Sequence, residues 1–514
     1  MRYGTIFAMQ HNNPVSSPPS PLAEHPPSGA YRVVVGMLPL WGLLLMLAML
    51  NYPLISRDLW TDEAYTVSYT VHPTMSALLE DVRKNEETPP LYFMSVWLWS
   101  RAFGTSEVAI RVLSVIYGAG AVLGFAAFIR QRLSPDAAVV AVVLMAASPL
   151  FQRYLTEARG YTMTVLLTVA CITAFERLYR RPESRLAQVI YALSAVVLFL
   201  TSYFGAALLA AQWLISLSLL RAPATRRRRI VGWVGVQMII VACLLPWLPS
   251  LRYQMFISPA VTSDWGSGLR DYYFLILGVL MGGVLLGGVR FLIGWLMAAA
   301  AGLILILAAA QGGRAMNGFV VRSLVLPAAM LLLMVVMIQV VATRYLIVIL
   351  PGSAIAAGVG FVALRSYRPW LAWTMLALLV GGMLLARVIT TPVDVPGAWG
   401  RLIARMTAEV DPAGDIVLFH PPWDQRIFEY YYHGPQLPMA GAHNYDDFYY
   451  NQGYVIRKTW TVAEAEPVIV GHRRVWVFYD QLHYQARALD LPYQQLGHWS
   501  EGRLELFLYD VPPR

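Results

Sequence analysis

Charged residues are scarce in this chain of 514 residues, and that scarcity decides its broad class. Only 13% of the residues are charged and 57% are hydrophobic, whereas soluble domains carry about a quarter charged residues. The composition therefore predicts an integral membrane protein. The formal charge of +9 comes from 39 Lys and Arg against 30 Asp and Glu. Most arginines lie in short loops between apolar segments, as they do where membrane spans are oriented, so we expect no nucleic-acid partner.

Cysteine is almost absent as well. Cys171 and Cys243 both lie within apolar segments, which excludes a disulfide framework and a cysteine-based zinc motif. The sequence also lacks a Walker A motif, a GxGxxG motif before a helix and an HExxH motif. No histidine lies within a predicted span. All nine histidines lie in the N-terminal tail, the first outer loop (His72) or the C-terminal part of the chain.

Apolar segments of about 20 residues, the length that crosses a bilayer, dominate the chain up to residue 390. Residues 1–30 form a Pro/Ser-rich tail that we expect to be disordered. Two apolar segments, 89–104 and 271–288, are predicted to lie along the outer membrane surface; counting both as spans would raise the total from 11 to 13. The 11 predicted spans are 33–51, 108–129, 137–150, 161–179, 187–201, 204–220, 230–248, 291–311, 322–342, 345–364 and 369–388.

Arginine-rich loops predict the orientation of these spans, because Lys and Arg accumulate on the cytoplasmic side. If all of them are cytoplasmic, the N-terminus lies inside and the C-terminus outside, in a multi-pass protein of the cell membrane. The outer segments are then 52–107, 151–160, 249–290, 343–344 and the chain from 389 onwards. The arginines concerned are Arg130, Arg132, Arg177, Arg180, Arg181, Arg185, Arg221, Arg226 to Arg229, Arg314, Arg322, Arg365 and Arg368.

The composition changes near residue 390. Fifteen of the 30 acidic residues lie beyond that point. Segments 415–419, 474–480 and 504–510 read as short strands, and 396–409 reads as an amphipathic helix. The predicted fold is therefore an all-α polytopic membrane domain at 31–389, followed by a small extracytoplasmic α/β domain at 390–514.

The first outer loop carries acids that could act in catalysis. LWTDEAYT at 59–66 places Asp62 and Glu63 just beyond the first span, and NEETPPLYF at 85–93 places Glu87 at a turn before two prolines. A carboxylate at the membrane surface can remove the proton from an attacking hydroxyl group. Adjacent acids point in different directions, so we expect only one of the pair to be catalytic. The simpler alternative is a helix start stabilised by acids.

Two further outer segments carry arginines beside tyrosines. SPLFQRYLTEARGYT at 148–162 holds Glu157, Arg159 and Tyr161, and Arg344-Tyr345 opens the span at 345–364. Arginine binds phosphate bidentately, which would suit a phosphorylated substrate. The alternative is an interfacial belt of Tyr and Arg, with Arg344 extended towards the lipid headgroups.

Together these motifs resemble those of the family 39-type glycosyltransferases of the GT-C superfamily, in particular the RgtA/B/C/D-like and dolichyl-phosphate-mannose-protein mannosyltransferase-like members. The resemblance covers roughly residues 30–390 in order and spacing, whereas the C-terminal domain matches only in position. The matching residues are Asp62-Glu63-Ala64-Tyr65, Pro89-Pro90-Leu91-Tyr92, Glu157-Ala158-Arg159-Gly160-Tyr161, and Arg344-Tyr345-Leu346 with Pro351.

The resemblance implies transfer of a sugar from a polyprenyl-phosphate donor to an acceptor on the outer face of the membrane. It implies Asp62 as the general base, and Arg159 or Arg344 as the contact for the donor phosphate. In related aminoarabinose transferases a Lys precedes the first proline, and the acid before that Lys can bind a metal. Here Thr88 replaces the Lys and Glu87 is retained. No histidine partner is evident at 249–290, so no metal or other cofactor is predicted. The acceptor stays open between a glycan, a lipid and a protein.

Two other classes of protein compete with this interpretation. A secondary transporter would place its acids within the spans and show an internal repeat, and this chain does neither. A membrane-anchored scaffold with an outer binding domain at 390–514 would leave the acid- and Arg-rich outer loops without a role. One shared cavity around Asp62, Glu87, Glu157 and Arg344 would favour the enzyme, and their dispersal would favour the scaffold.

Overall fold

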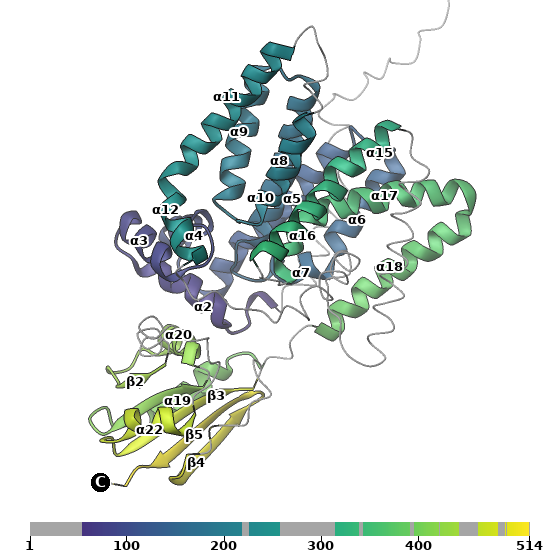
Figure 1. The fold of residues 1–514 in the computed structure, drawn as a ribbon. Coiled ribbons are helices and arrows are strands. Elements are labelled where there is room, and N and C mark those ends of the chain that lie inside the picture. The colour runs from purple at the N-terminus through teal and green to yellow at the C-terminus, as the bar shows by residue number, and fades with distance from the viewer. Residues whose placement is uncertain are drawn as a thin grey trace, which may run out of the picture. The chain divides into compact units, whose positions relative to one another are not determined.

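The computed structural model describes residues 54–217, 226–256, 314–338, 343–390, 395–420, 422–441, 461–481, 489 and 491–512 (Figure 1). The predicted tail at 1–30, the spans predicted at 33–51 and 291–311, and the surface helix predicted at 271–288 lie outside these residues.

The described part of the chain up to residue 390 is helical, as the apolar segments predicted. Its first helices, up to α7, are α2 (Thr61–Ser68), η1 (Tyr69–Val71), α3 (Met75–Asn85), α4 (Leu91–Phe103), α5 (Glu107–Ile129), α6 (Pro135–Ala147) and α7 (Pro149–Leu155). The later ones are α8 (Tyr161–Arg180), α9 (Arg185–Phe199), α10 (Gly205–Ser216), α11 (Arg226–Leu244), α12 (Leu248–Phe256), α15 (Arg314–Val320), α16 (Leu326–Ile338), η7 (Thr343–Ile349), α17 (Leu350–Tyr367) and α18 (Pro369–Thr390).

Several of these helices can cross a membrane. Within the described residues, 107–129, 161–180, 229–254, 317–337 and 344–367 are each long and apolar enough to do so. Helices α6 and α7 meet the same test as a pair bent by 54°. The bend lies at Ser148, whose backbone is extended and which precedes Pro149; the residue before a proline is driven out of the helical region. Helices α9, α10 and the first part of α18 are apolar but shorter.

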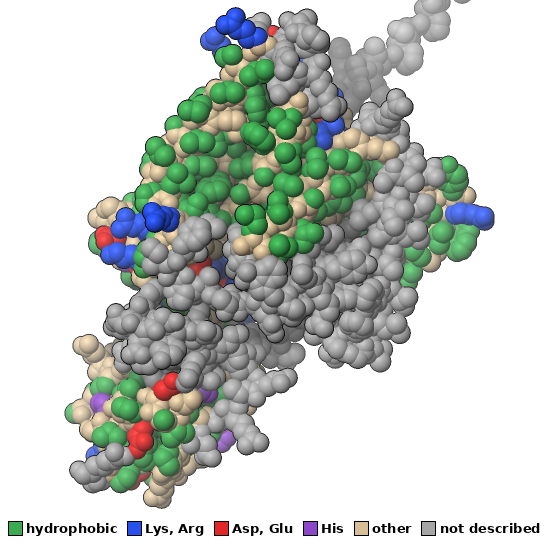
Figure 2. Space-filling view, viewed as in Figure 1, with side chains coloured by type: hydrophobic (Ala, Val, Ile, Leu, Met, Phe, Trp, Pro, Cys, Tyr) green, Lys and Arg blue, Asp and Glu red, His purple; other side chains and the backbone are tan. Residues whose placement is uncertain are grey.

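Apolar side chains cover the outside of this helical part. Figure 2 shows them spread over the face formed by α9, α10, α11 and α16. They include exposed residues that a soluble protein would bury: Leu193, Trp213, Val234, Met238, Val241, Leu333 and Met337. An extended apolar surface of this kind suits a lipid environment.

The segment 54–106, which precedes α5, is folded into short helices. Helix α4 corresponds to the predicted surface helix, and it begins directly after Pro89 and Pro90, as their fixed backbone predicted. The segment 151–160, predicted to be a loop between two spans, is helical in its first half, because Phe151–Leu155 belongs to α7. Only residues 156–160 connect α7 to α8, and this short turn carries the predicted Glu157 and Arg159.

The C-terminal part contains a five-stranded sheet of order β2-β1-β3-β5-β4. β1 is parallel to β2 and β3, and β5 is antiparallel to β3 and β4. The three predicted strands correspond to β1, β3 and β5, and the predicted helix to α19. The elements are α19 (Ala398–Thr407), β1 (Asp415–His420), η8 (Pro422–Asp424), α20 (Gln425–Tyr431), β2 (Met439–Ala440), α22 (Val462–Ile469), β3 (Arg474–Asp480), β4 (Gln494–Glu501) and β5 (Leu504–Asp510).

Both faces of this sheet are covered, because alternate residues of its central strands point to opposite sides. Val417 and Phe419 of β1 pack with α19 and α20 on one face. Ile416 and Leu418 pack with α22 on the other face. This α/β arrangement places α20 beside α2, the helix that carries Asp62 and Glu63.

Candidate active site

Helix α2 turns its two acids in different directions. Glu63 is fully buried and binds Arg111 of α5 through both carboxylate oxygens: Arg111 Nε donates to Oε1 (2.8 Å) and Nη2 donates to Oε2 (2.6 Å). The backbone N–H of Ala158 also donates to Oε1, at 2.7 Å. Although burial alone would raise the pKa of Glu63, the charge and hydrogen bonds of Arg111 lower it. Glu63 is therefore a buried anion that joins α2, α5 and the 156–160 turn.

Arg111 extends this network to the chain that precedes α2. Its guanidinium donates to the backbone carbonyls of Ile55 (2.8 Å), Arg57 (2.5 Å) and Asp58 (3.0 Å). Arg111 thus fixes both residues 55–58 and α2 to helix α5. Because the guanidinium is planar, its donors reach several acceptors at fixed directions.

Asp62 lies on a more accessible side of α2. Its carboxylate accepts a hydrogen bond from Arg344 Nη1 at 3.3 Å, and the two side chains are 27% and 37% exposed. Arg344 belongs to η7, some 280 residues further along the chain, next to Tyr345. The packing of helices thereby joins the first and last sequence motifs in one ion pair.

Arg159 approaches α2 from the 156–160 turn. Its Nη1 lies 3.4 Å from both the backbone carbonyl of Asp62 and the hydroxyl of Thr66. The same atom lies 3.5 Å from Glu86 Oε1, and the guanidinium is stacked over Phe93 at 5.8 Å from the ring centroid. Arg159 is therefore held on several sides within reach of the Asp62 region.

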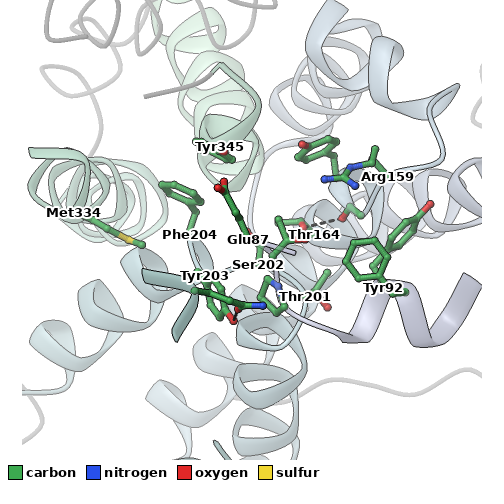
Figure 3. A pocket seen from close by; sticks show the side chains of 16 residues that line it. Glu87, Tyr92, Arg159, Thr164, Thr201, Ser202, Tyr203, Phe204, Met334 and Tyr345 are labelled. Carbon is green, nitrogen blue, oxygen red and sulfur yellow. Dashed lines mark hydrogen bonds between the residues drawn. The ribbon is translucent and has the colours of Figure 1, made fainter. Parts of the chain in front are cut away.

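A cavity of about 960 Å³, part of it open to solvent, lies beside these residues. Figure 3 shows that Glu87, Arg159 and Tyr345 reach it from three separate elements. Its floor includes Tyr203, whose hydroxyl donates to Gln254 Oε1 (2.5 Å) and accepts from Trp247 Nε1 (2.8 Å). The wall of this cavity is completed by Thr88, Pro89, Tyr92, Phe93, Gly160, Tyr161, Thr164, Thr201, Ser202, Phe204 and Met334.

Aromatic rings shape the cavity. Tyr345 is stacked on Phe204 with centroids 4.0 Å apart, and Tyr161 packs against Tyr154 at 4.2 Å. Gly160 suits the narrow part of the wall, since a Cβ there would lie 3.1 Å from the Cβ of Tyr92, a tighter contact than most Cβ atoms make. The result is a largely apolar recess with a few convergent polar groups, the usual composition of a small-molecule site.

The acids of this region differ from Glu63 in their electrostatics. Burial raises the pKa of Glu86 despite the nearby Arg159. Burial also raises the pKa of Glu87, and the charge of Asp62 raises it further, while Arg344 and Arg159 oppose the shift. Two arginines and three carboxylates therefore share a small region in which protonation changes the net charge.

The C-terminal part contacts α2 and the residues before it. Thr61 Oγ1 donates to Asp424 Oδ1 at 3.1 Å, in a buried contact with η8. The Leu59 N–H donates to the Tyr431 hydroxyl at 2.9 Å. Asp58 accepts from the backbone N–H groups of Gly397 (2.7 Å) and Trp399 (3.0 Å) at the start of α19. The helix that bears Asp62 is thus held by both parts of the chain.

Comparison with known proteins identifies this arrangement. Residues 87–249 match the family described as dolichyl-phosphate-mannose-protein mannosyltransferase. The structure of ArnT from Cupriavidus metallidurans bound to undecaprenyl phosphate superposes with a TM-score of 0.56 at 14% identity, covering 94% of this chain and 98% of that one. The chain has the GT-C fold. The fold implied by its sequence motifs is confirmed.

Another solved structure supports the same fold. The archaeal oligosaccharyltransferase AglB from Archaeoglobus fulgidus, in complex with an inhibitory peptide and a dolichol-phosphate, superposes with a TM-score of 0.50 at 13% identity, covering 85% of this chain and 69% of that one. No curated protein matches the chain by sequence. The GT-C fold is therefore shown by the two structural superpositions and by the family match to residues 87–249, although the sequence identities are low.

The GT-C structure brings together most, but not all, of the predicted site residues. Glu87, Arg159, Tyr161 and Tyr345 line the cavity, and Asp62 adjoins it through its contacts with Arg159 and Arg344. The expectation that one of two adjacent acids points away is met by Glu63, which is buried against Arg111 and has no exposed surface.

Glu157 is another predicted site residue that lies apart from the cavity. It does not line the cavity, because the turn after α7 directs its side chain into the protein, where Arg153 Nε lies at 3.0 Å and Arg57 Nη2 at 3.8 Å. Burial raises its pKa. The prediction that Glu157 and Asp62 share one cavity is therefore wrong.

Sequence reasoning missed Arg111 and Glu86. Arg111 lies within the span predicted at 108–129, and a charge one turn inside a span is itself a sign of a buried partner. Glu86 directly precedes Glu87, and only the turn geometry shows that it, rather than Glu87, pairs with Arg159.

Proposed function

We propose that this protein is an integral membrane glycosyltransferase that transfers a sugar from a polyprenyl-phosphate donor to an acceptor on the outer face of the membrane, with inversion at the anomeric carbon. The observation that carries the proposal is the convergence of Asp62, Arg159 and Arg344 beside one aromatic-walled cavity in a GT-C fold. The same convergence speaks against a scaffold, whose outer loops would have no reason to meet.

The proposed reaction needs one base and one displacement. The Asp62 carboxylate takes the proton of the acceptor hydroxyl as its oxygen attacks the anomeric carbon. The new C–O bond forms on the face opposite the phosphate, and the old bond between the anomeric carbon and the phosphate oxygen breaks. Polyprenyl phosphate leaves with the electron pair of that bond. A single displacement of this kind inverts the anomeric centre.

The departing phosphate gains negative charge, and the arginines are placed to neutralise it. Arg344 already pairs with Asp62, but a guanidinium carries five N–H donors. Its Nε is buried and has no hydrogen-bond partner among the described residues. Arg344 can therefore hold the Asp62 side chain in position while it binds a phosphate oxygen. Arg159 provides a second cation at the cavity wall, and the apolar recess suits the prenyl chain next to the phosphate.

The test of the base is Asp62→Asn, which keeps the size of the side chain and removes its basicity. We expect a loss of transfer rate of roughly 10²–10⁴-fold with donor binding retained. The assay incubates the purified protein in lipid nanodiscs with a panel of polyprenyl-phosphate sugars and measures released polyprenyl phosphate. The matched control is Asp136→Asn, an exposed acid that pairs with Arg365 away from the cavity. Wild-type turnover by Asp62→Asn would overturn the assignment.

A further inference from the structure

A second concave surface lies between α2 and the C-terminal part of the chain. This acceptor-side groove, about 2510 Å³ including its open mouth, runs between residues 64–72 and α20. Four tyrosines line it: Tyr65 and Tyr69 from the α2 side, and Tyr430 and Tyr431 from α20. Nothing in the proposed reaction of the donor uses these residues.

The groove adjoins the proposed base. Asp62 and Tyr65 are three residues apart on α2, so their side chains are neighbours on one helical face. Tyr69 forms a shared wall: it lines the groove and packs edge-on against Phe93 (5.0 Å between centroids), which lines the cavity proposed to hold the donor, the donor-side cavity. A ligand in the groove would therefore lie beside Asp62, separated from the donor-side cavity by the thickness of one ring.

The tyrosines are held in place before any ligand arrives. The Tyr430 hydroxyl donates to the Thr105 carbonyl (3.0 Å), and the Tyr431 hydroxyl donates to Glu107 (2.9 Å). The Arg426 guanidinium lies over the Tyr65 ring at 5.6 Å and is itself paired with Glu429 (3.1 Å). Fixed rings bind with little loss of side-chain freedom, which favours affinity.

The charge of the groove selects against anions. Its lining contains the carboxylates Asp81, Glu107 and Glu429 and one arginine, Arg426, which with neutral histidines gives a formal charge of −3 + 1 = −2. A phosphorylated or carboxylated ligand would be repelled, in contrast to the cavity beside Arg159 and Arg344. A ligand that offers many hydroxyl groups instead finds carboxylate acceptors and the Asn85 amide.

We propose that the groove binds a neutral glycan chain, and that this chain is the acceptor. Sugar rings present flat C–H faces that fit tyrosine rings, and their hydroxyl groups donate to carboxylates. The identity of the glycan as acceptor rests on the proposed glycosyltransferase function. The binding of a glycan in the groove does not, and the two can be tested separately.

The binding test uses the full-length protein in nanodiscs with neutral pentasaccharides of glucose, mannose, galactose and arabinose, and with a carboxylated pentasaccharide for comparison. Saturation-transfer NMR reports which sugar protons contact the protein. We expect signals from at least one neutral chain and none from the carboxylated one. Tyr65→Leu and Glu429→Gln should each weaken binding about tenfold, whereas Tyr367→Leu and Glu80→Gln, outside the groove, should not.

Two results would overturn the proposal. One is that no neutral chain binds while a peptide or lipid acceptor is glycosylated with unchanged kinetics by both groove variants. The other is that chains bind equally well to wild type and variants. The same preparations measured for release of polyprenyl phosphate keep the two hypotheses apart: a glycan that binds through Tyr65 but never receives a sugar supports the groove and counts against the transferase.

Discussion

Asp62 and Glu63 are adjacent in sequence, but their amide variants should differ in whether they lose stability or rate of transfer. Glu63→Gln should destabilise the protein, whereas Asp62→Asn should leave it folded and slow. Glu63 and Arg111 both have fully buried side chains, joined by two hydrogen bonds of 2.6 and 2.8 Å. The neutral amide introduced by Glu63→Gln would leave the Arg111 charge buried without its counter-ion.

The magnitudes follow from burial. Breaking a buried ion pair by removing one partner costs about 3–5 kcal/mol, because the remaining charge stays desolvated. The pair of Asp62 and Arg344 is 27% and 37% exposed, and pairs that reach solvent contribute about 0–1 kcal/mol. Glu63→Gln should therefore lower the unfolding temperature clearly, and Asp62→Asn should shift it little.

The assay is thermal unfolding of both variants in nanodiscs, followed by intrinsic fluorescence, together with single-turnover sugar transfer at a temperature where both are folded. At that temperature Glu63→Gln should retain much more transfer than Asp62→Asn. If Glu63→Gln has the wild-type unfolding temperature but transfers no sugar, the reasoning is refuted and Glu63 becomes the candidate base. If neither variant changes transfer, α2 does not carry the base.

Three other predictions concern the donor and the membrane. Arg344→Ala should weaken donor binding about tenfold or more, measured by titration with polyprenyl phosphate, since a charge-assisted contact to phosphate is lost; wild-type affinity would contradict its role. Because burial raises the pKa of Glu87, this acid begins to take up a proton at a higher pH than usual, so donor binding should strengthen as pH falls from neutral. Glu87→Gln should reduce that pH dependence, and an unchanged slope would show that Glu87 does not face the phosphate. Protease added to intact cells should remove residues 390–514 and spare the N-terminal tail, and the reverse pattern would refute the orientation.

The membrane part was predictable because its signal is physical and local. A bilayer requires long apolar helices, and the segments 108–129, 161–179 and 345–364 match helical segments of the structure within a few residues. The strands β1, β3 and β5 were equally visible, since each is a short run rich in aliphatic and aromatic residues. Patterns set by solvent and by backbone geometry need no knowledge of distant partners.

The site was only partly predictable, because its decisive contacts join residues far apart in the sequence. Asp62 and Arg344 were each identified from short motifs, but their ion pair depends on how η7 packs near α2. Glu157 was misplaced because its side chain follows the end of α7, a helix that the sequence pattern did not predict. Arg111 was not identified as a site residue, because the average hydropathy of an apolar segment conceals a single charge. That charge nevertheless holds α2 in place.

Both parts of the chain hold the segment around α2 that carries Asp62. Asp58 caps the start of α19, and Thr61 contacts Asp424. The C-terminal part therefore binds both ends of the turn at 58–61, which directly precedes Asp62. Arg111 of α5 holds the same turn through its hydrogen bonds to the Asp58 carbonyl and to Glu63. A general base that must meet the acceptor hydroxyl as it attacks needs a fixed position, since small displacements cost large factors in rate. On this proposal the C-terminal α/β part is a structural component of the active site: it fixes the proposed base and, through α20, forms the opposite wall of the groove in which the acceptor is proposed to lie.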